Sequence, residues 1–139
     1  MPWKKACVEV VAIALMVVAC ASPPPIDPET SGPPDGVDYT MAIQCAGVGN
    51  AIRTFQPDQG SFSDGARLGA RYATWAKHIS GADWAAVQAD IETSRKDFVR
   101  EAGNGANEKR IARLEADYAD ALDVCRTLAD LPELIFIGG

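Results

Sequence analysis

Apolar side chains recur at helical spacing along the chain after about residue 38. The first stripe has spacings of 4, 3, 4 and 3 and consists of Met41, Cys45, Val48, Ile52 and Phe55. Because spacings of three and four residues place side chains on one face of an α-helix, this stripe predicts an amphipathic helix that begins near Asp38. Pro57 and Gly60 predict its end, since both residues break regular structure.

Three more apolar stripes predict three more helices. Their members are Leu68, Tyr72, Trp75 and Ile79 in the second, Trp84, Val87, Ile91 and Phe98 in the third, and Ile111, Leu114, Tyr118, Ala121, Cys125 and Leu128 in the fourth. We expect the aromatic members to belong to the core. Asp64 lies near the start of the second helix, Gly81 and Gly103 follow the second and third, and Pro132 stops the fourth. Four amphipathic helices with short connections predict an all-α domain over residues 38–139, folded as an up-down-up-down four-helix bundle.

Two cysteines test this topology. In such a bundle the start of the first helix lies beside the end of the last. Cys45 follows Asp38 by seven residues and Cys125 precedes Leu131 by six, which places them about 10 Å and about 9 Å from that end at 1.5 Å per residue. The matching heights predict a structural disulfide. The sequence has no C-x-x-C arrangement around them that would indicate redox activity.

The first 19 residues are expected to be an export signal. Lys4 and Lys5 precede an uninterrupted apolar run over residues 10–19, about half the length of roughly 20 residues that a membrane-spanning helix needs. A basic start, a short apolar segment and small residues at its end are typical of a signal peptide.

The signal ends in Val17-Val18-Ala19-Cys20, which resembles a bacterial lipobox. The resemblance implies a lipoprotein precursor that is cleaved after Ala19 and diacylated on the Cys20 thiol, with a further acyl chain such as palmitate on the new amine. Ala21, rather than Asp, favours the periplasmic face of the outer membrane by analogy with enteric bacteria. Two alternatives stay open: cleavage after Ala21, which would release a soluble protein, and an uncleaved apolar segment. Either cleavage leads to an oxidising compartment, where a bonded Cys45–Cys125 pair is expected.

Residues 20–37 predict a spacer between the lipidated cysteine and the helical domain. This stretch has almost no apolar side chains and contains Pro23, Pro24, Pro25, Pro28, Pro33 and Pro34. Such a composition cannot form a core and favours an extended, semi-rigid conformation. At about 3.1 Å per residue, the segment would reach about 50 Å at most.

The sequence offers little catalytic or metal-binding chemistry. His78 is the one histidine of the chain, and no other residues have the spacing of a metal site or a nucleophile–base pair. Gly47-Val48-Gly49 follows no strand and is therefore no phosphate loop; small residues there suit close packing against another helix, such as at the disulfide crossing. We expect no catalytic residue, no metal and no cofactor.

Charge is distributed unevenly along the predicted bundle. The chain has 13 basic and 19 acidic side chains, a net charge of −6, which argues against nucleic acid as a partner. Basic residues gather at the end away from the spacer, and the candidate contact residues there are Arg53, Arg67, Arg71, Arg100, Lys109, Arg110 and Arg113. This end suits an anionic envelope polymer or an envelope protein. The alternative is that these residues pair with acids across the helices.

The apolar C-terminal run is the last candidate for an interaction. It consists of Leu134, Ile135, Phe136 and Ile137. We expect it either to fold back onto the core or to offer a strand to a partner.

Together these features favour a non-enzymatic envelope lipoprotein: a small helical binding or assembly module that a lipid anchor holds at the membrane. The alternative is a periplasmic stress chaperone or inhibitor of the small, helical, disulfide-bonded type, which the chain resembles in form alone. An enzyme that acts on the cell wall is the third hypothesis.

Overall fold

Five helices make up the described part of the protein, residues 32–56 and 63–131 of a computed structural model. They are α3 (Tyr39–Thr54), α4 (Asp64–Ser80), α5 (Trp84–Ala102), α6 (Asn107–Asp117) and α7 (Ala119–Leu128). Neither of the two described ranges contains a strand. The all-α prediction is confirmed, and α3, α4 and α5 lie where the first three apolar stripes predict them.

Side-chain caps define the starts of the first three helices. Asp38, Ser63 and Asp83 each accept a hydrogen bond from the backbone N–H three residues later. Such a cap pairs one of the N–H groups that the first turn of a helix leaves without a partner. At the other end of α4, Gly81 has a φ of 68°, the left-handed conformation that commonly terminates a helix.

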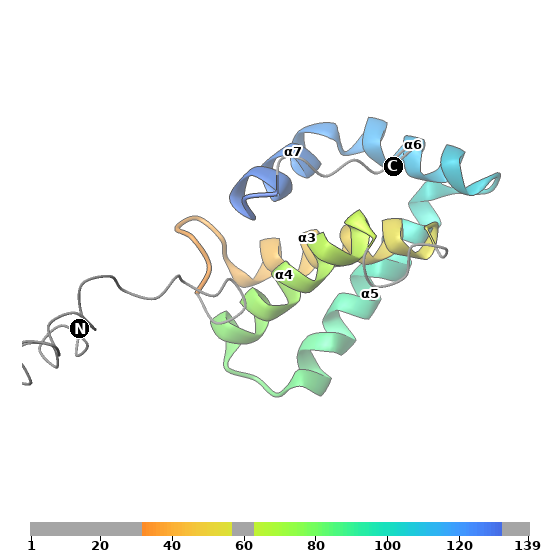
Figure 1. The fold of residues 1–139 in the computed structure, drawn as a ribbon. Coiled ribbons are helices and arrows are strands. Elements are labelled where there is room, and N and C mark those ends of the chain that lie inside the picture. Colours follow the sequence, from red (N-terminus) through yellow and green to blue (C-terminus); the bar gives the residue numbers. More distant parts are fainter. Residues whose placement is uncertain (1–31, 57–62, 132–139) are drawn as a thin grey trace, which may run out of the picture.

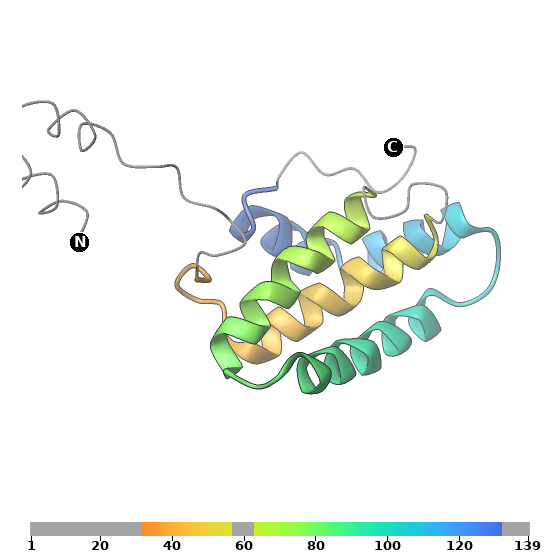
Figure 2. The same ribbon diagram turned by 60° about the horizontal axis from the view of Figure 1, so that its bottom comes forward.

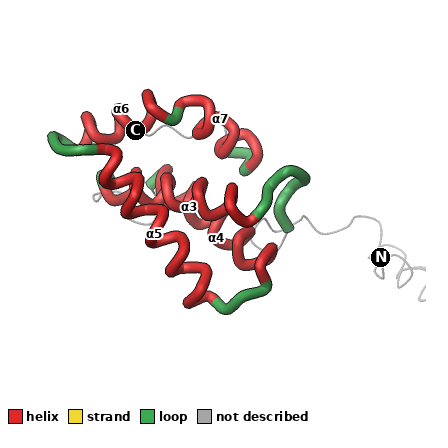
Figure 3. The backbone as a smooth tube through the Cα atoms, turned by 180° about the vertical axis from the view of Figure 1, so that it is seen from behind, coloured by secondary structure: helices red, strands yellow, loops and turns green. Residues whose placement is uncertain are grey.

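α3 is the central helix of the fold (Figures 1 and 2). It packs along both α4 and α5, whereas α4 and α5 approach each other much less closely. α6 and α7 form a second layer, seen above the other three helices in Figures 1 and 3. The square arrangement of four helices that the sequence predicts is not confirmed, because α3 contacts both of the next two helices.

The predicted fourth helix is divided into α6 and α7. Tyr118 lies between them with φ −122° and ψ 29°, outside the helical region. Its ring packs edge-on against Phe98 of α5, with the ring centroids 5.1 Å apart. The apolar stripe continues through the break without a glycine or proline, so the sequence pattern gives no sign of it.

Glycines bring the backbones of α3 and α4 into contact. A Cβ atom added to Gly49 would lie 2.7 Å from the backbone nitrogen of Gly69, and one added to Gly65 would lie 2.6 Å from that of Arg53. A Cβ on Gly47 would instead meet Ser94 of α5. The predicted close packing at Gly47 and Gly49 is thus present, but it faces α5 and α4 rather than the disulfide.

The core follows the predicted stripes with two exceptions, Ala121 and Trp84. Ala121 is exposed, and its neighbour Leu122 is buried instead. The largest fully buried side chains are Tyr72, Ile52, Leu68, Leu114, Leu122, Val87 and Ser63. Trp84, by contrast, is 44% exposed, so its predicted place in the core is wrong. It is the first residue of α5, where the chain has only just left the α4–α5 connection.

Candidate functional site

The disulfide joins the second layer to the central helix. Cys45 of α3 and Cys125 of α7 are bonded, with their Cα atoms 5.9 Å apart and a sequence separation of 80. The pairing predicted from the matching heights of the two cysteines is confirmed. It ties α7 directly to the middle of the fold.

Two residues of α4 hold the same part of α7. The Tyr72 hydroxyl donates a hydrogen bond of 2.7 Å to the carbonyl of Cys125, and the Arg71 guanidinium donates one to the carbonyl of Ala129. Burial raises the pKa of Tyr72 to about 12, although the positive charge of Arg71 acts in the opposite direction. Tyr72 therefore keeps its proton, and its role as donor, well above neutral pH.

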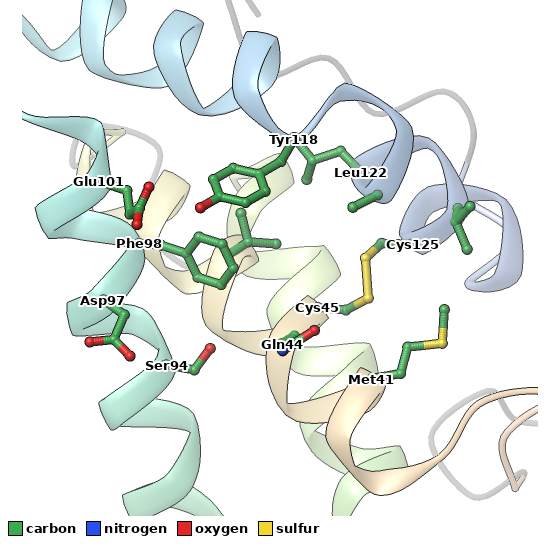
Figure 4. Close-up of a pocket in the computed structure, with 13 residues that line it drawn as sticks. Met41, Gln44, Cys45, Ser94, Asp97, Phe98, Glu101, Tyr118, Leu122 and Cys125 are labelled. Atoms are coloured by element: carbon green, nitrogen blue, oxygen red, sulfur yellow. A yellow bond between two sulfur atoms is a disulfide. The ribbon is translucent and has the colours of Figure 1, made fainter.

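An open cavity of about 540 Å³ lies beside the disulfide, between α3, α5 and the α6–α7 layer (Figure 4). We call it the α7 groove. Its volume falls within the range of about 300–1,000 Å³ that is usual for ligand sites. The disulfide itself forms part of the wall, so the bond that fastens α7 also shapes the groove.

Apolar side chains from all three sides line the α7 groove. α3 contributes Met41 and Val48, α5 contributes Phe98, and α7 contributes Leu122 and Val124. In Figure 4 the Phe98 ring lies beside the Tyr118 ring at one side, and Met41 lies beyond the disulfide at the other. Val124 is 43% exposed, so part of this apolar lining faces solvent.

Two carboxylates of α5 stand along one edge of the groove. Asp97 forms an ion pair of 3.1 Å with Arg100 at the surface, and Glu101 lies beside Tyr118 (Figure 4). Burial raises the pKa of Tyr118, and a hydrogen bond to Glu101 raises it further. Among the described residues that line the groove there is no lysine or arginine. Its edge therefore has a negative charge of its own.

A shallower cavity of about 340 Å³ extends the groove along α3 and α5. The two cavities share Gln44, Ser94 and Asp97. At the far end the Tyr39 hydroxyl donates a hydrogen bond of 2.6 Å to the Asp90 carboxylate. This hydrogen bond is the main cause that raises the pKa of Tyr39 to about 12. The extension adds a third carboxylate of α5 and no basic residue to the lining of the described chain.

Several residues of the predicted basic contact surface bind within the chain. Arg71 contacts the end of α7, as described above, and Arg113 donates to the carbonyls of Ala102 and Asn104 at the end of α5. The Arg110 guanidinium lies 4.2 Å from the centre of the Phe55 ring. These three residues connect the helices to one another.

The other four members of that surface are exposed. Arg67 and Arg100 lie near acids three residues earlier, at 3.7 Å from Asp64 and 3.1 Å from Asp97. Arg53 and Lys109 are exposed at the end of α3 and the start of α6. The basic contact surface stays a prediction, with a smaller set of residues available to a partner than the sequence suggests.

The remaining candidates contribute little to a site. His78 is exposed in the last turn of α4. Within residues 32–56 and 63–131 no group of histidine, cysteine, aspartate and glutamate side chains could hold a metal ion, and no helix there is long and apolar enough to span a membrane. The lipidation candidate Cys20 and the tail residues Leu134, Ile135, Phe136 and Ile137 lie outside the described residues.

Sequence reasoning did not find the α7 groove. One signal was available: Asp90, Ser94, Asp97 and Glu101 follow helical spacing along α5, next to the apolar stripe of Ile91 and Phe98. These polar residues would ordinarily indicate a solvated face. They border a cavity here because the break at Tyr118 and the disulfide set the position of α7.

Comparisons with known proteins assign no family to this chain. No protein-family model matches it, and no curated protein or solved structure matches it either.

Proposed function

We propose that the protein is a non-enzymatic lipoprotein of a bacterial cell envelope, with a small helical binding module at its C-terminal side. Residues 1–19 are the signal peptide, residues 20–37 carry the lipidated Cys20 and the spacer, and residues 38–139 form the module. In this proposal α6 and α7 together act as the bent fourth member of an up-down-up-down bundle, and the groove beside them receives a partner from the envelope.

The observation that carries the proposal is the Cys45–Cys125 disulfide in the wall of an open apolar groove. Structural disulfides persist in exported proteins and are rare in the reducing cytosol. A concave apolar surface with a few polar groups at its edge is the usual form of a binding site. The two features coincide at one place, and this supports both export and binding.

The anchor is tested by replacing the cysteine at the expected cleavage site. Cys20→Ala should abolish labelling by a fatty-acid analogue and release the protein from the membrane fraction. Cys7→Ala is the matched control, because Cys7 lies inside the signal and should be removed with it. If the Cys20→Ala protein still pellets with membranes, an uncleaved apolar segment holds it there and the lipoprotein proposal is wrong.

The binding module is tested by placing a photo-crosslinking amino acid at Val124 in the full chain in cells. Val124 lines the groove and is partly exposed, whereas the nearby exposed Thr127 does not line it and serves as the control. Crosslinks to an envelope component from position 124 but not from position 127 would support the proposal. Equal crosslinking from both positions would indicate random collisions.

The same open apolar groove also supports the alternative, a periplasmic chaperone or inhibitor. The composition of the crosslinked material separates the two functions. One folded partner in stable amounts indicates a binding module. Many unrelated proteins, captured only after the envelope is stressed, would indicate a chaperone.

A further inference from the structure

We infer that the α7 groove and its extension bind a basic amphipathic helix of a partner polypeptide. Its apolar side chains would fill the groove, and its lysine or arginine side chains would lie beside the carboxylates of α5. This inference rests on the proposed binding module and names the ligand class for the same site. Three properties of the described residues support it: an apolar lining, a negative edge and an elongated shape.

The apolar lining requires an apolar counterpart. Met41, Phe98, Leu122 and Val124 line the groove from three different elements. Val124 is 43% exposed although it is a large apolar residue. A ligand that covers such side chains removes apolar surface from water, which is the main favourable contribution to association.

The negative edge selects for positive charge. Asp90, Asp97 and Glu101 follow one another on α5 at spacings of seven and four residues, which is one face of a helix. Their side chains belong to the lining of the groove or its extension, where the described residues include no lysine or arginine. Arg100 compensates part of this charge at the surface by pairing with Asp97. Complementary charge along an interface sets its specificity and its rate of association.

The shape selects for a segment of chain rather than a compact small molecule. The two cavities adjoin along α3 and α5, where they share the lining residues Gln44, Ser94 and Asp97. From Asp90 to Glu101 the axis of α5 advances about 16 Å at 1.5 Å per residue, the length of about three helical turns. Recognition of an amphipathic helix by a groove uses anchors spaced three, four and seven residues apart, and these anchors span a similar length.

The disulfide makes this site conditional on oxidation. One wall of the groove belongs to α7, which the Cys45–Cys125 bond joins to α3. α7 makes few close backbone approaches to helices other than α6. A reduced protein should therefore retain α3, α4 and α5 but lose the fixed distance between the walls of the groove.

A synthetic helical peptide of about 14 residues, with leucines on one face and lysines on the other, is the probe. The control is the same peptide with glutamate in place of every lysine. We expect the oxidised protein to bind the lysine peptide in a calorimetric titration, more weakly as salt is added. Reduction should abolish binding, and backbone NMR shifts should concentrate around Met41, Glu101 and Val124.

Charge-neutral variants identify the edge. Asp97→Asn/Glu101→Gln should weaken binding of the lysine peptide by about tenfold, since close charge pairs at an interface contribute at that scale. Asp35→Asn/Glu108→Gln changes the net charge equally at two exposed positions outside the groove and should leave affinity within about twofold. Both variants replace exposed side chains, and equal melting temperatures will verify that they fold alike.

Four results would overturn the inference. The first is equal binding of the lysine and glutamate peptides, and the second is equal loss of affinity in the two double variants. The third is a tenfold gain in affinity for the lysine peptide when the chain is truncated after Glu133, which would show that the chain's own end occupies the groove. The fourth is a dimer of the natural protein that the Val124→Ser substitution dissociates, which would show that the occupant is a second copy.

The crosslinking experiment separates failure of this inference from failure of the proposed function. If position 124 captures an envelope component in cells while the lysine peptide does not bind, the groove is a binding site and the ligand class is wrong. If neither occurs, the binding module itself is wrong.

Discussion

α4 and α7 are attached to the central helix α3 in opposite ways. α3 and α4 meet backbone to backbone, through Gly49 and Gly65, over a long contact between two regular helices. α7 is attached through side chains: one disulfide to α3, with hydrogen bonds from Tyr72 and Arg71 of α4. The first interface leaves no space between helices, whereas the second fixes α7 at a distance and leaves the α7 groove beside it.

This difference separates stability from binding within one small domain. Ile52 of α3 and Leu68 of α4 are completely buried, and fully packed interiors have no room for a ligand. A layer held by a few specific links can border an open cavity without collapsing into it. We therefore expect substitutions at the α3–α4 interface to change folding, and substitutions at α7 to change the groove first.

Removal of the disulfide should have the largest effect. In Cys45→Ala/Cys125→Ala the free energy of unfolding should fall by about 2–4 kcal/mol, because a cross-link over 80 residues no longer restricts the unfolded chain. Hydrogen exchange should show that the amides of α7 lose protection while those of α3 and α4 keep theirs. If protection falls equally in all helices, α4 and α7 belong to one cooperative unit and their different attachments do not separate stability from binding.

Alanine at the glycine crossing should come next. A Cβ at Gly65 would lie 2.6 Å from two backbone atoms, Arg53 N and Gly49 O. Gly65→Ala should therefore destabilise the protein by about 1–3 kcal/mol, the usual cost of overpacking. Urea unfolding monitored by circular dichroism measures the change.

Gly69→Ala is the matched control on the same helix. Its Cβ would meet the side-chain oxygen of Asn50, whose flexible end can move away. The higher helix propensity of alanine, about 1 kcal/mol over glycine, offsets part of any strain. If the two alanine variants lose equal stability, backbone contact is not what distinguishes this interface.

The sequence was informative wherever the determinants of structure are local. Apolar spacing located α3, α4 and α5, and the height of Cys45 and Cys125 along their helices identified the disulfide. Capping residues such as Asp83 mark helix starts through a bond three residues away. Each of these signals depends on residues that are close in sequence or on the constant rise per residue of a helix.

The groove could not be predicted because it depends on contacts between distant residues. The break at Tyr118 occurs inside an unbroken apolar stripe, where the ring packs against Phe98 of another helix. The central position of α3 depends on which glycines of different helices pack together. Gly49 alone does not indicate whether it packs against α4 or α7. The predicted basic surface contained too many residues for a similar reason, because Arg71 and Arg113 donate hydrogen bonds to backbone carbonyls of other elements.

Tyr72→Phe should have a moderate effect confined to α7. It removes the hydrogen bond to the Cys125 carbonyl, which should cost about 1 kcal/mol and increase hydrogen exchange in α7. Burial raises the pKa of Tyr72 to about 12 in the folded protein, above the ordinary value of about 10. The folded state therefore holds this proton more tightly, so its stabilising contribution is complete below about pH 10 and is lost as the pH rises toward 12.

Tyr39→Phe is the control for this alkaline loss. The pKa of Tyr39 is also raised to about 12, mainly by its hydrogen bond to Asp90, but Tyr39 begins α3 and does not hold α7. Exchange rates in α7 should therefore respond to Tyr72→Phe and not to Tyr39→Phe. Faster exchange of the α7 amides in both variants would mean that the position of α7 also depends on the contact between α3 and α5.

The smallest expected effect is a gain in stability at Glu115, where α6 and α7 approach each other. Burial raises the pKa of the Glu115 carboxyl, and the charge of Arg126, whose guanidinium lies 4.0 Å away, opposes this rise only in part. A raised pKa means that the folded state binds the proton more tightly than the unfolded chain, so stability decreases as the pH rises through that pKa. At neutral pH the ionised carboxylate is therefore a net cost.

Glu115→Gln should remove this cost and stabilise the protein by less than about 0.5 kcal/mol, a small value because the ion pair is lost too and solvent screens the site. Thermal unfolding from pH 3 to pH 8 should show the two proteins converging at acid pH and the variant melting slightly higher at neutral pH. Glu108→Gln is the control, because it removes an exposed acid from the first turn of α6, where a negative charge is favourable, and should therefore give no gain in melting temperature. A variant that is less stable than the natural protein at pH 7 would show that the Arg126 pair outweighs burial, and would add Glu115 to the side chains that hold α7 in place.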